Sequence, residues 1–330
     1  MKRTNIVIIA IAVALAIALS FCYHFLTNTN KNDNISPESK ISGNTYPMVV
    51  KDALGDSITI EKRPERIISL APGITEALFA IGCGDRVVGV TSYCNYPPEV
   101  KDLPVIGDSI TPNIEKITEL KPDLIIGQRG NDRKMLTKLK SLGFKLISVD
   151  PVSYDSLMNS IDIIGKITDG KEYKNLNATI ATLKNTYIQK KEELEKAEGF
   201  KGHPKVLFLF SPDGVLYSAG DGTIINEMIT IAGGENIAQY TGTAWPQLTM
   251  ELVTAENPDV IIIATGSMNQ DPKPIKEVIK DFKKDAKWKN ITAVKDGNVY
   301  YADGDSVTIL GPRLINGLEE FYKILEKHHK

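Results

Sequence analysis

The sequence predicts an α/β protein in which two similar lobes, each built on a mostly parallel sheet, are joined by one long helix. The first observation behind this prediction is a charged stretch from Lys171 to Glu198 that contains no proline and no glycine. At 1.5 Å per residue, a helix of this length would be roughly 40 Å long, which is enough to cross between two lobes. Its apolar residues recur at the spacing of one helix face. They are Leu176, Ile180, Leu183, Tyr187 and Leu194.

The second observation is a pair of similar segments on either side of this stretch. Ile114–Asn131 and Met250–Ser267 align without a gap, and each predicts a helix, a Pro-Asp turn, an apolar strand and a glycine. Helix–turn–strand units often converge on such a pattern, which is enough to explain one match. We favour two lobes of like fold. The identical pairs are Glu115/Glu251, Thr118/Thr254, Pro122/Pro258, Asp123/Asp259, Ile125/Ile261, Ile126/Ile262 and Gly130/Gly266.

The third observation is the alternation of continuous apolar strands with helices, which favours parallel sheets covered on both faces. The first lobe begins near Tyr46 with a hairpin, Met48–Ile60, that turns at Gly55-Asp56. Its later strands are expected at residues 66–70, 86–90, 123–127 and 145–149, and its helices at 74–81, 113–120 and 133–141. A further helix, 153–168, is expected to lead into the long one.

The second lobe is expected to begin after Gly202-His203-Pro204. Its predicted strands are residues 205–210, 259–265 and 298–303, and its predicted helices are 223–232, 248–256, 275–283 and a closing helix from Val307 to Glu326. Ligands of open α/β sheets bind outside the carboxyl ends of the strands, so two facing sheets predict a cleft between the lobes. The resulting division is 1–26 signal or membrane anchor, 27–46 flexible linker, 47–152 first lobe, 153–200 bridging helices and 201–330 second lobe.

The composition excludes some classes of function. A chain of 330 residues suggests about two domains, and 42% hydrophobic with 24% charged residues is ordinary for a globular protein with a core. The formal net charge is −2 and the basic residues are scattered, so no nucleic-acid partner is expected.

The N-terminus predicts export. Lys2 and Arg3 precede an apolar run that extends to Leu26, as in a signal segment or a membrane anchor. Residues 19–22, Leu-Ser-Phe-Cys, resemble a lipobox that would make Cys22 a lipidated anchor, although Phe21 is poorly suited to the cleaved bond. Ordinary cleavage after residues 18–20 and an uncleaved anchor remain alternatives. Each places the protein in the cell envelope, outside the cytoplasm, and we expect it on the outer face of the cytoplasmic membrane, attached through its N-terminus only.

The sequence carries no recognisable catalytic or metal motif. Cys83 and Cys94 flank a predicted strand of about 16 Å, too far apart for a disulfide, so both are expected to be free thiols. None of the four histidines lies at metal-site spacing from a cysteine, and no nucleophile elbow or phosphate loop is present. We therefore expect neither an enzyme nor a resident cofactor.

Aromatic and amide side chains gather in the loops expected at the cleft. The loop TSYCNYPP places Tyr93, Cys94, Asn95 and Tyr96 beside one strand end, and the loop GTAWPQ carries Trp245. Asp305 follows the last strand. Flat apolar faces with a few polar groups suit a large, mostly neutral organic ligand. Core packing explains any one of these rings equally well.

Several segments together resemble a known family. APGITEALFAIG, VVGVTSYCNYPP, LKPDLIIGQRG, GGENI and AWPQLTMELVTAENPDVIII, in this order, are similar to class III periplasmic solute-binding proteins of ABC importers, and most of all to their cobalamin-binding members. The resemblance covers about residues 60–325. It implies two Rossmann-like lobes bridged by a single helix. It also implies a monomer that captures a metal chelate, here a corrinoid such as cobalamin or cobinamide, and delivers it unchanged to a permease dimer with its ATPase.

The resemblance also implies site residues. By position, Tyr93 or Tyr96 and Trp245 match pocket aromatics, and Asp305 matches a carboxylate that meets corrin amides. Gln128 stands where the cobalamin binders have tryptophan, and Ile309 where they have arginine. A tryptophan before the Asn113 helix is also missing. These departures leave haem or a ferric siderophore as alternative ligands. An envelope enzyme or a sensor domain is the third alternative, but the sequence offers neither a nucleophile–base pair nor a signalling segment.

Two glutamates match a docking pair. The resemblance places Glu76 and Glu251 on the two lobes where arginines of a permease dimer would meet them, each in the first turn of a predicted helix. Either one taken alone is explained as well by the helix dipole. Because the long helix contains no glycine or proline hinge, we also expect only small changes on ligand binding.

Overall fold

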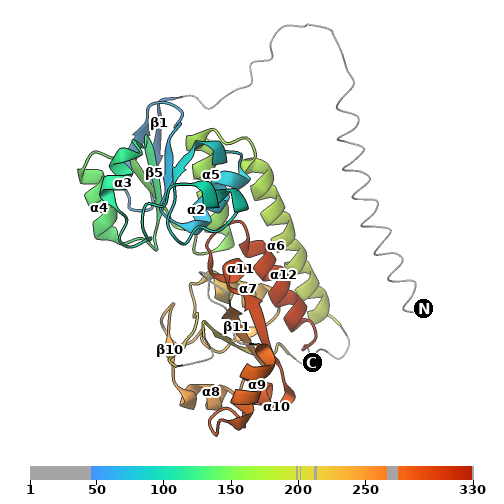
Figure 1. Ribbon diagram of the computed structural model, residues 1–330. Coiled ribbons are helices and arrows are strands. Elements are labelled where there is room, and N and C mark those ends of the chain that lie inside the picture. The colour runs from blue at the N-terminus through green and yellow to red at the C-terminus, as the bar shows by residue number, and fades with distance from the viewer. Residues whose placement is uncertain (1–45, 198–199, 201, 212–213, 266–273, 329–330) are drawn as a thin grey trace. The chain divides into compact units, whose positions relative to one another are not determined.

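The computed structural model describes residues 46–197, 200, 202–211, 214–265 and 274–328 (Figure 1). These residues belong to one compact unit. The predicted export segment, most of the predicted linker and Cys22 lie outside the described residues. Within those residues, no helix is both long and apolar enough to cross a membrane.

The first lobe, here called the N-lobe, is built on a four-stranded parallel sheet with the order β4-β3-β5-β6. The predicted hairpin is present as β1 and β2, which pair antiparallel from Met48↔Ile60 to Lys51↔Ser57. The strands are β1 Met48–Lys51, β2 Ser57–Ile60, β3 Ile67–Ser69, β4 Val87–Gly89, β5 Leu124–Gln128 and β6 Leu146–Val149.

Side-chain caps begin most of the N-lobe helices. Asn113 and Asp132 each accept a hydrogen bond from a first-turn N–H, and Ser153 forms a capping box with Ser156. Such caps satisfy N–H groups that have no partner inside the helix. The helices are α2 Pro72–Ala80, α3 Ile114–Glu119, α4 Arg133–Ser141 and α5 Tyr154–Thr168, with short 3-10 turns η1 Gly84–Arg86 and η2 Pro98–Asp102.

The predicted long helix is confirmed as α6, Tyr173–Glu195, which has 23 residues. It buries Tyr173, Ile180 and Tyr187 and contacts α5 of the N-lobe as well as α7 and α12 of the second lobe (Figure 1). At 1.5 Å per residue its length is about 35 Å, so one element runs along both lobes.

The second lobe, here called the C-lobe, has a parallel sheet with the order β12-β11-β7-β9. Its strands are β7 Lys205–Leu209, β9 Glu235–Asn236, β11 Val260–Thr265 and β12 Val299–Asp303. A small antiparallel pair, β8 Leu216–Tyr217 and β10 Gln247–Leu248, was not predicted. The helices are α7 Ile224–Ile231, α8 Met250–Glu256, α9 Ile275–Lys284, α10 Thr292–Asp296, α11 Gly304–Thr308 and α12 Leu314–Leu325.

The internal repeat folds as predicted, as α3 followed by β5 and as α8 followed by β11. Lys121 and Asn257, which are equivalent in the two copies, both adopt a left-handed backbone with φ of 44° and 45°. The carboxylate of Asp123 accepts hydrogen bonds from the N–H groups of Glu65 and Arg66, just before β3. That of Asp259 accepts one from Lys205, at the start of β7. In both lobes the repeated aspartate therefore fixes the neighbouring strand to the central one.

The predicted closing helix, Val307–Glu326, is wrong as one element. The chain instead forms α11, leaves helical geometry at Ile309 (φ −78°, ψ 115°), and starts α12 at Leu314. Gly311-Pro312 lies in the gap, and a proline disfavours helical geometry in the residue before it. The interruption matters because the segment from Val307 to Arg313 meets the N-lobe.

Candidate ligand-binding cleft

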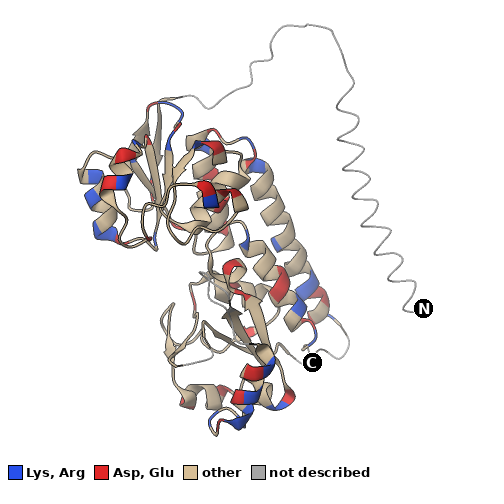
Figure 2. Cartoon of the chain, in the orientation of Figure 1, with Lys and Arg blue, Asp and Glu red and all other residues tan. Residues whose placement is uncertain are grey.

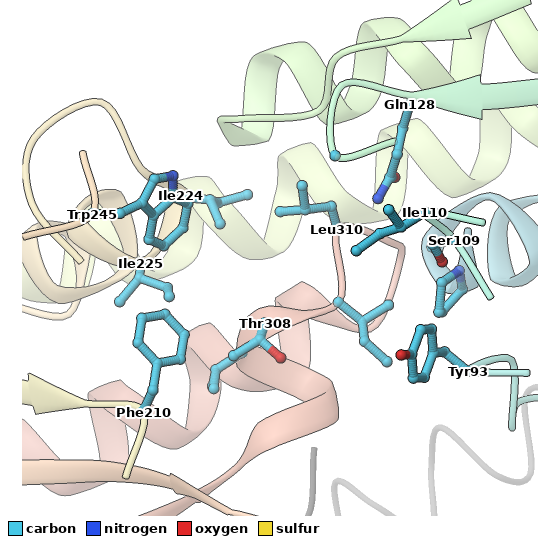
Figure 3. Close-up of a pocket in the computed structure, with 15 residues that line it drawn as sticks. Tyr93, Ser109, Ile110, Gln128, Phe210, Ile224, Ile225, Trp245, Thr308 and Leu310 are labelled. Carbon is cyan, nitrogen blue, oxygen red and sulfur yellow. The ribbon is translucent and has the colours of Figure 1, made fainter. Parts of the chain in front are cut away.

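A cavity of about 440 Å³ lies between the lobes, within the size range of small-molecule sites (Figure 3). Loops after β3, β4 and β5 and the first residues of α2 contribute its N-lobe wall. The end of β7, α7, the loop before β10 and α11 with the residues that follow contribute the other wall. The lining residues are Pro72, Gly73, Tyr93, Ser109, Ile110, Gln128, Gly130, Phe210, Ile224, Ile225, Trp245, Val307, Thr308, Ile309 and Leu310.

An aromatic platform forms part of the C-lobe wall. The rings of Trp245 and Phe210 lie 5.9 Å apart at 51°, and Phe208 supports Phe210 edge-on at 5.1 Å. Two backbone hydrogen bonds, from Gly220 to Ala244 (2.8 Å) and from Ser218 to Pro246 (3.0 Å), fix the loop that carries Trp245. Trp245 is nevertheless 56% exposed, so a large apolar ring is held in place without being buried. This is the arrangement expected for a ring that stacks on a ligand.

The loop that carries Ser109 and Ile110 is fixed by the carboxylate of Asp108. It accepts hydrogen bonds from the N–H of Ile110 (2.8 Å), the N–H of Thr111 (2.6 Å) and the Thr111 hydroxyl (2.9 Å). These bonds, led by the one from the Thr111 N–H, lower the pKa of Asp108. The carboxylate therefore stays ionised at neutral pH and keeps this loop in place beside the cavity.

Asn131, which was not predicted from the sequence, connects three segments of the same wall. Its Nδ2 donates to the carbonyls of Leu70 (2.9 Å) and Ser109 (2.8 Å), and its Oδ1 accepts from the N–H of Gln128 (2.8 Å). The side chain is buried and all of these bonds are made inside the N-lobe. The only sequence signal was an asparagine shortly after an apolar strand, which by itself is typical of an ordinary turn.

The side-chain amide of Gln128 borders the cavity. Its Oε1 is buried without a hydrogen-bond partner among the described residues, and Figure 3 shows the amide group extending toward the cavity. The other polar groups of the lining come from Tyr93, Ser109, Thr308 and the Trp245 indole. No charged side chain lines the cavity in the described part of the chain. The lining is therefore suited to a neutral ligand with large apolar faces and a few hydrogen-bonding groups.

The structure places the sequence-predicted residues in two groups. Tyr93, Gln128 and Trp245 line the cavity, together with Ile309. Cys94, Asn95, Tyr96 and Asp305 do not line it, although they lie nearby in sequence or space. Phe210, Ile110, Ile224 and Ile225 also line the cavity but were not predicted, because single apolar residues near strands and helix starts look like ordinary core residues.

The residues outside the cavity have partners of their own. The thiol of Cys94 lies 3.2 Å from the Thr75 hydroxyl and 3.3 Å from that of Thr91, and burial raises its pKa. Asn95 donates to Asp305 at 2.8 Å, and Tyr96 lies under the guanidinium of Arg313. Both Cys83 and Cys94 are free cysteines, as predicted. No cluster of three metal-ligating side chains occurs among the described residues.

The prediction that Glu76 lies in a first helical turn, available to a partner, is wrong. Helix α2 begins at Pro72, so Glu76 belongs to its second turn, and its side chain is only 2% exposed. The carboxylate accepts two hydrogen bonds from Arg313, at 2.9 and 2.6 Å. Glu251, by contrast, is exposed in the first turn of α8. Docking at Glu251 stays a prediction.

Two parallel sheets, one long helix along both lobes and a ligand-sized cavity between them define the class of helix-bridged solute-binding proteins. The periplasmic binding protein family model matches residues 67–306, and the chain belongs to that family. It is therefore an extracytoplasmic solute-binding protein of an ABC importer and not an enzyme.

Known relatives are similar over most of the chain. An uncharacterised ABC transporter substrate-binding lipoprotein, YvrC of Bacillus subtilis, is 35% identical over 294 residues, covering 87% of this chain and 88% of the relative. The vitamin B12-binding protein of Yersinia pestis is 31% identical over 212 residues, covering 62% of this chain and 71% of the relative.

Solved structures show the same fold. The vitamin B12-binding protein BtuF of Vibrio cholerae has a TM-score of 0.65 and 25% identity, covering 80% of this chain and 97% of that structure. The haem-binding protein RhuT of Roseiflexus sp. RS-1 has a TM-score of 0.62 and 27% identity, covering 79% of this chain and 99% of that structure.

Proposed function

We propose that the protein captures a corrinoid of the cobalamin or cobinamide type and delivers it to the permease of an ABC importer. The observation that carries this proposal is the lining of the cavity, which combines an exposed tryptophan platform with the side-chain amide of Gln128 and contains no charged side chain among the described residues. A corrin ring has broad faces and peripheral amides. Trp245 would stack on a face, and the side-chain amide of Gln128 would form a hydrogen bond with one of the peripheral amides.

The uncharged lining of the cavity is less well suited to the alternative ligands, haem and a ferric siderophore. Haem carries two propionates, and many ferric siderophores are anionic, so both call for cationic side chains at the site. One feature favours haem, because a tyrosine hydroxyl is an established ligand of haem iron and Tyr93 lies in the cavity. The haem-binding structural relative keeps this second candidate open to test.

A visible absorption titration of the purified domain distinguishes these ligands. The protein used lacks residues 1–45. It is titrated in turn with dicyanocobinamide, cyanocobalamin, haemin and a ferric siderophore. We expect saturable binding of one corrinoid per protein molecule and no saturation with the anionic chelates. Tight haemin binding without corrinoid binding would replace the proposal, and Tyr93→Phe would then test the iron ligand.

We further propose that the ligand is cargo and that the protein holds no resident cofactor. The partners would be a permease dimer with its ATPase, met by a monomer whose N-terminus attaches to the outer face of the cytoplasmic membrane. The lipoprotein among its relatives supports attachment. Mass spectrometry of the mature N-terminus decides among lipidated Cys22, a cleaved signal and an uncleaved anchor.

A further inference from the structure

A polar cluster beside the cavity joins the two lobes directly. From the C-lobe, the Nε and one terminal nitrogen of Arg313 donate to the same oxygen of Glu76 at 2.9 and 2.6 Å. A second link runs from the Nδ2 of Asn95 to Asp305 at 2.8 Å. Arg313 also lies 3.6 Å from that Asp305 oxygen, and its guanidinium stacks over Tyr96 at 4.6 Å from the ring centre. The Asp305–Arg313 contact lies within the C-lobe. The other contacts all join a residue of the N-lobe to a residue of the C-lobe.

The cluster is largely removed from water. Side-chain exposure is 2% for Glu76, 12% for Asp305 and 17% for Arg313. Burial raises the pKa of Glu76. The hydrogen bonds and charge of Arg313 lower this pKa, but by less than burial raises it. Burial also works to lower the pKa of Arg313, but the bond to Glu76 raises it, so the guanidinium remains charged. A buried charge that loses its partner is costly, so these contacts resist separation of the lobes.

The backbones of the lobes also touch at a pair of glycines. A Cβ added to Gly73 would lie 2.1 Å from the carbonyl oxygen of Leu310. A Cβ added to Gly311 would lie 2.8 Å from the Cα of Gly73. No other residue type fits at either position without moving one lobe. The lobes are therefore in contact at this point, one helical turn from Glu76.

The cluster shares its supporting elements with the cavity. Asp305 and Arg313 bracket the segment Val307–Leu310, and all four residues of that segment line the cavity. On the other side, Pro72 and Gly73 line the cavity at the start of α2, the helix that carries Glu76. A change in these interlobe contacts must therefore displace cavity walls on both lobes.

We propose that the Glu76–Arg313 and Asn95–Asp305 contacts form an interlobe clamp that fixes the width of the cleft and so selects ligands by thickness. The selection of corrinoids rests on the proposed function, whereas the clamp itself does not. Arg313 is a positioning residue in this scheme, because it acts on the ligand through the segment Val307–Leu310.

The first experiment measures the radius of gyration and the amide exchange of the ligand-free protein. Arg313→Met breaks the Glu76–Arg313 contact of the clamp and leaves the Asn95–Asp305 bond in place. Lys140→Met is the matched control, because Lys140 pairs with the buried Asp52 at 2.9 Å entirely within the N-lobe. We expect Arg313→Met alone to enlarge the radius of gyration in small-angle scattering and to accelerate amide exchange in peptides covering residues 304–313 by about tenfold. Equal scattering and exchange in the two variants would overturn the clamp.

Two further variants protect this test against misfolding. Glu76→Gln combined with Arg313→Gln removes both charges of the pair, so that neither residue is left as a buried ion, while Asp305 keeps its hydrogen bond from Asn95. Gly73→Ala leaves the ion pair intact but inserts a methyl group between the lobes. We expect both to widen the cleft, and an unchanged radius of gyration in the folded double variant would overturn the clamp.

The selection is tested with dissociation constants for dicyanocobinamide and cyanocobalamin, since cobinamide lacks the lower nucleotide and is the thinner ligand. We expect Arg313→Met to shift the ratio of the two constants by about fivefold toward cobalamin, with no shift in Lys140→Met. An opened cleft with an unchanged ratio would overturn the selection. A wild-type protein that binds neither corrinoid contradicts the proposed function instead, while scattering still decides the clamp.

Discussion

Glu76 and Glu251 occupy similar places in sequence and opposite environments in the structure. Each follows a cleft-side loop, near the start of a helix in its own lobe. Glu251 is exposed, and hydrogen bonds from its own N–H and from the Thr249 side chain lower its pKa. Glu76 is buried against Arg313, and burial raises its pKa. One glutamate faces solvent, whereas the other holds the two lobes together.

The difference comes from what covers each helix start. The first turn of α8 lies at the surface, so the carboxylate of Glu251 is free to meet solvent or a partner. The start of α2 is covered by the segment between α11 and α12, where Leu310 and Gly311 approach Gly73. A matched pair of residues in a repeated fold therefore need not have matched roles. Figure 2 shows Lys and Arg interspersed with Asp and Glu on the outer helices of both lobes.

Removing Glu76 should give the largest effect on stability. Glu76→Ala removes the carboxylate that accepts both hydrogen bonds from Arg313 and leaves the guanidinium only the more distant Asp305, at 3.6 Å. We therefore expect the free energy of unfolding to fall by about 3 kcal/mol, the low end for breaking a buried ion pair. Urea denaturation followed by circular dichroism measures this loss. Glu251→Ala is the control and should leave the unfolding midpoint unchanged. Equal midpoints for the two variants would show that the buried pair contributes nothing.

Trp245→Ala should mainly affect binding. Because the ring is more than half exposed, its loss should change the unfolding midpoint little. Loss of a stacking surface for the macrocycle should weaken corrinoid binding by about 1–3 kcal/mol, as measured by calorimetry. Tyr240→Ala is a useful control, because Tyr240 is 81% exposed and does not line the cavity. Equal affinities of the two variants would remove Trp245 from the site.

Asp108→Ala should have a smaller effect, confined to the loop beside the cavity. The carboxylate has a lowered pKa in the folded protein, so its contribution is complete above the ordinary aspartate pKa. It is lost as the pH falls through the lowered value. We expect the variant to bind ligand more weakly at neutral pH and to lack this acid-dependent step in a stability–pH profile. A wild-type profile retained by the variant would contradict the assignment.

Glu251→Lys should have the smallest effect on the isolated protein. We expect unchanged stability and ligand affinity, because the side chain is exposed and lies outside the cavity. Delivery of ligand to the permease in reconstituted vesicles should fall, and the defect should depend on ionic strength. Full transport by this variant would exclude Glu251 from docking. The matching change at Glu76 would instead disrupt the lobe contact and report nothing on docking.

The loops that form the candidate site were largely predictable from the sequence. Which residues of those loops line the cavity was only partly predictable. Parallel sheets place their carboxyl-terminal loops at one edge, so Tyr93, Gln128 and Trp245 were expected at the cleft, where they line the cavity. Asn95, in the loop that carries Tyr93, and Asp305, in α11, instead bond to each other beside the cavity. Loop membership follows from the order of elements, whereas the direction of a side chain depends on contacts with the opposite lobe.

The sequence by itself determined the features that depend on near neighbours. Periodicity established α6, and the repeated Pro-Asp turn established equivalent helix–strand units in the two lobes. Only the tertiary structure decided the partners of Glu76 and Asn95, which lie 237 and 210 residues away. Contacts across such separations depend on how the two lobes meet along α6. The pairing of Glu76 with Arg313 therefore has no local signal in the sequence.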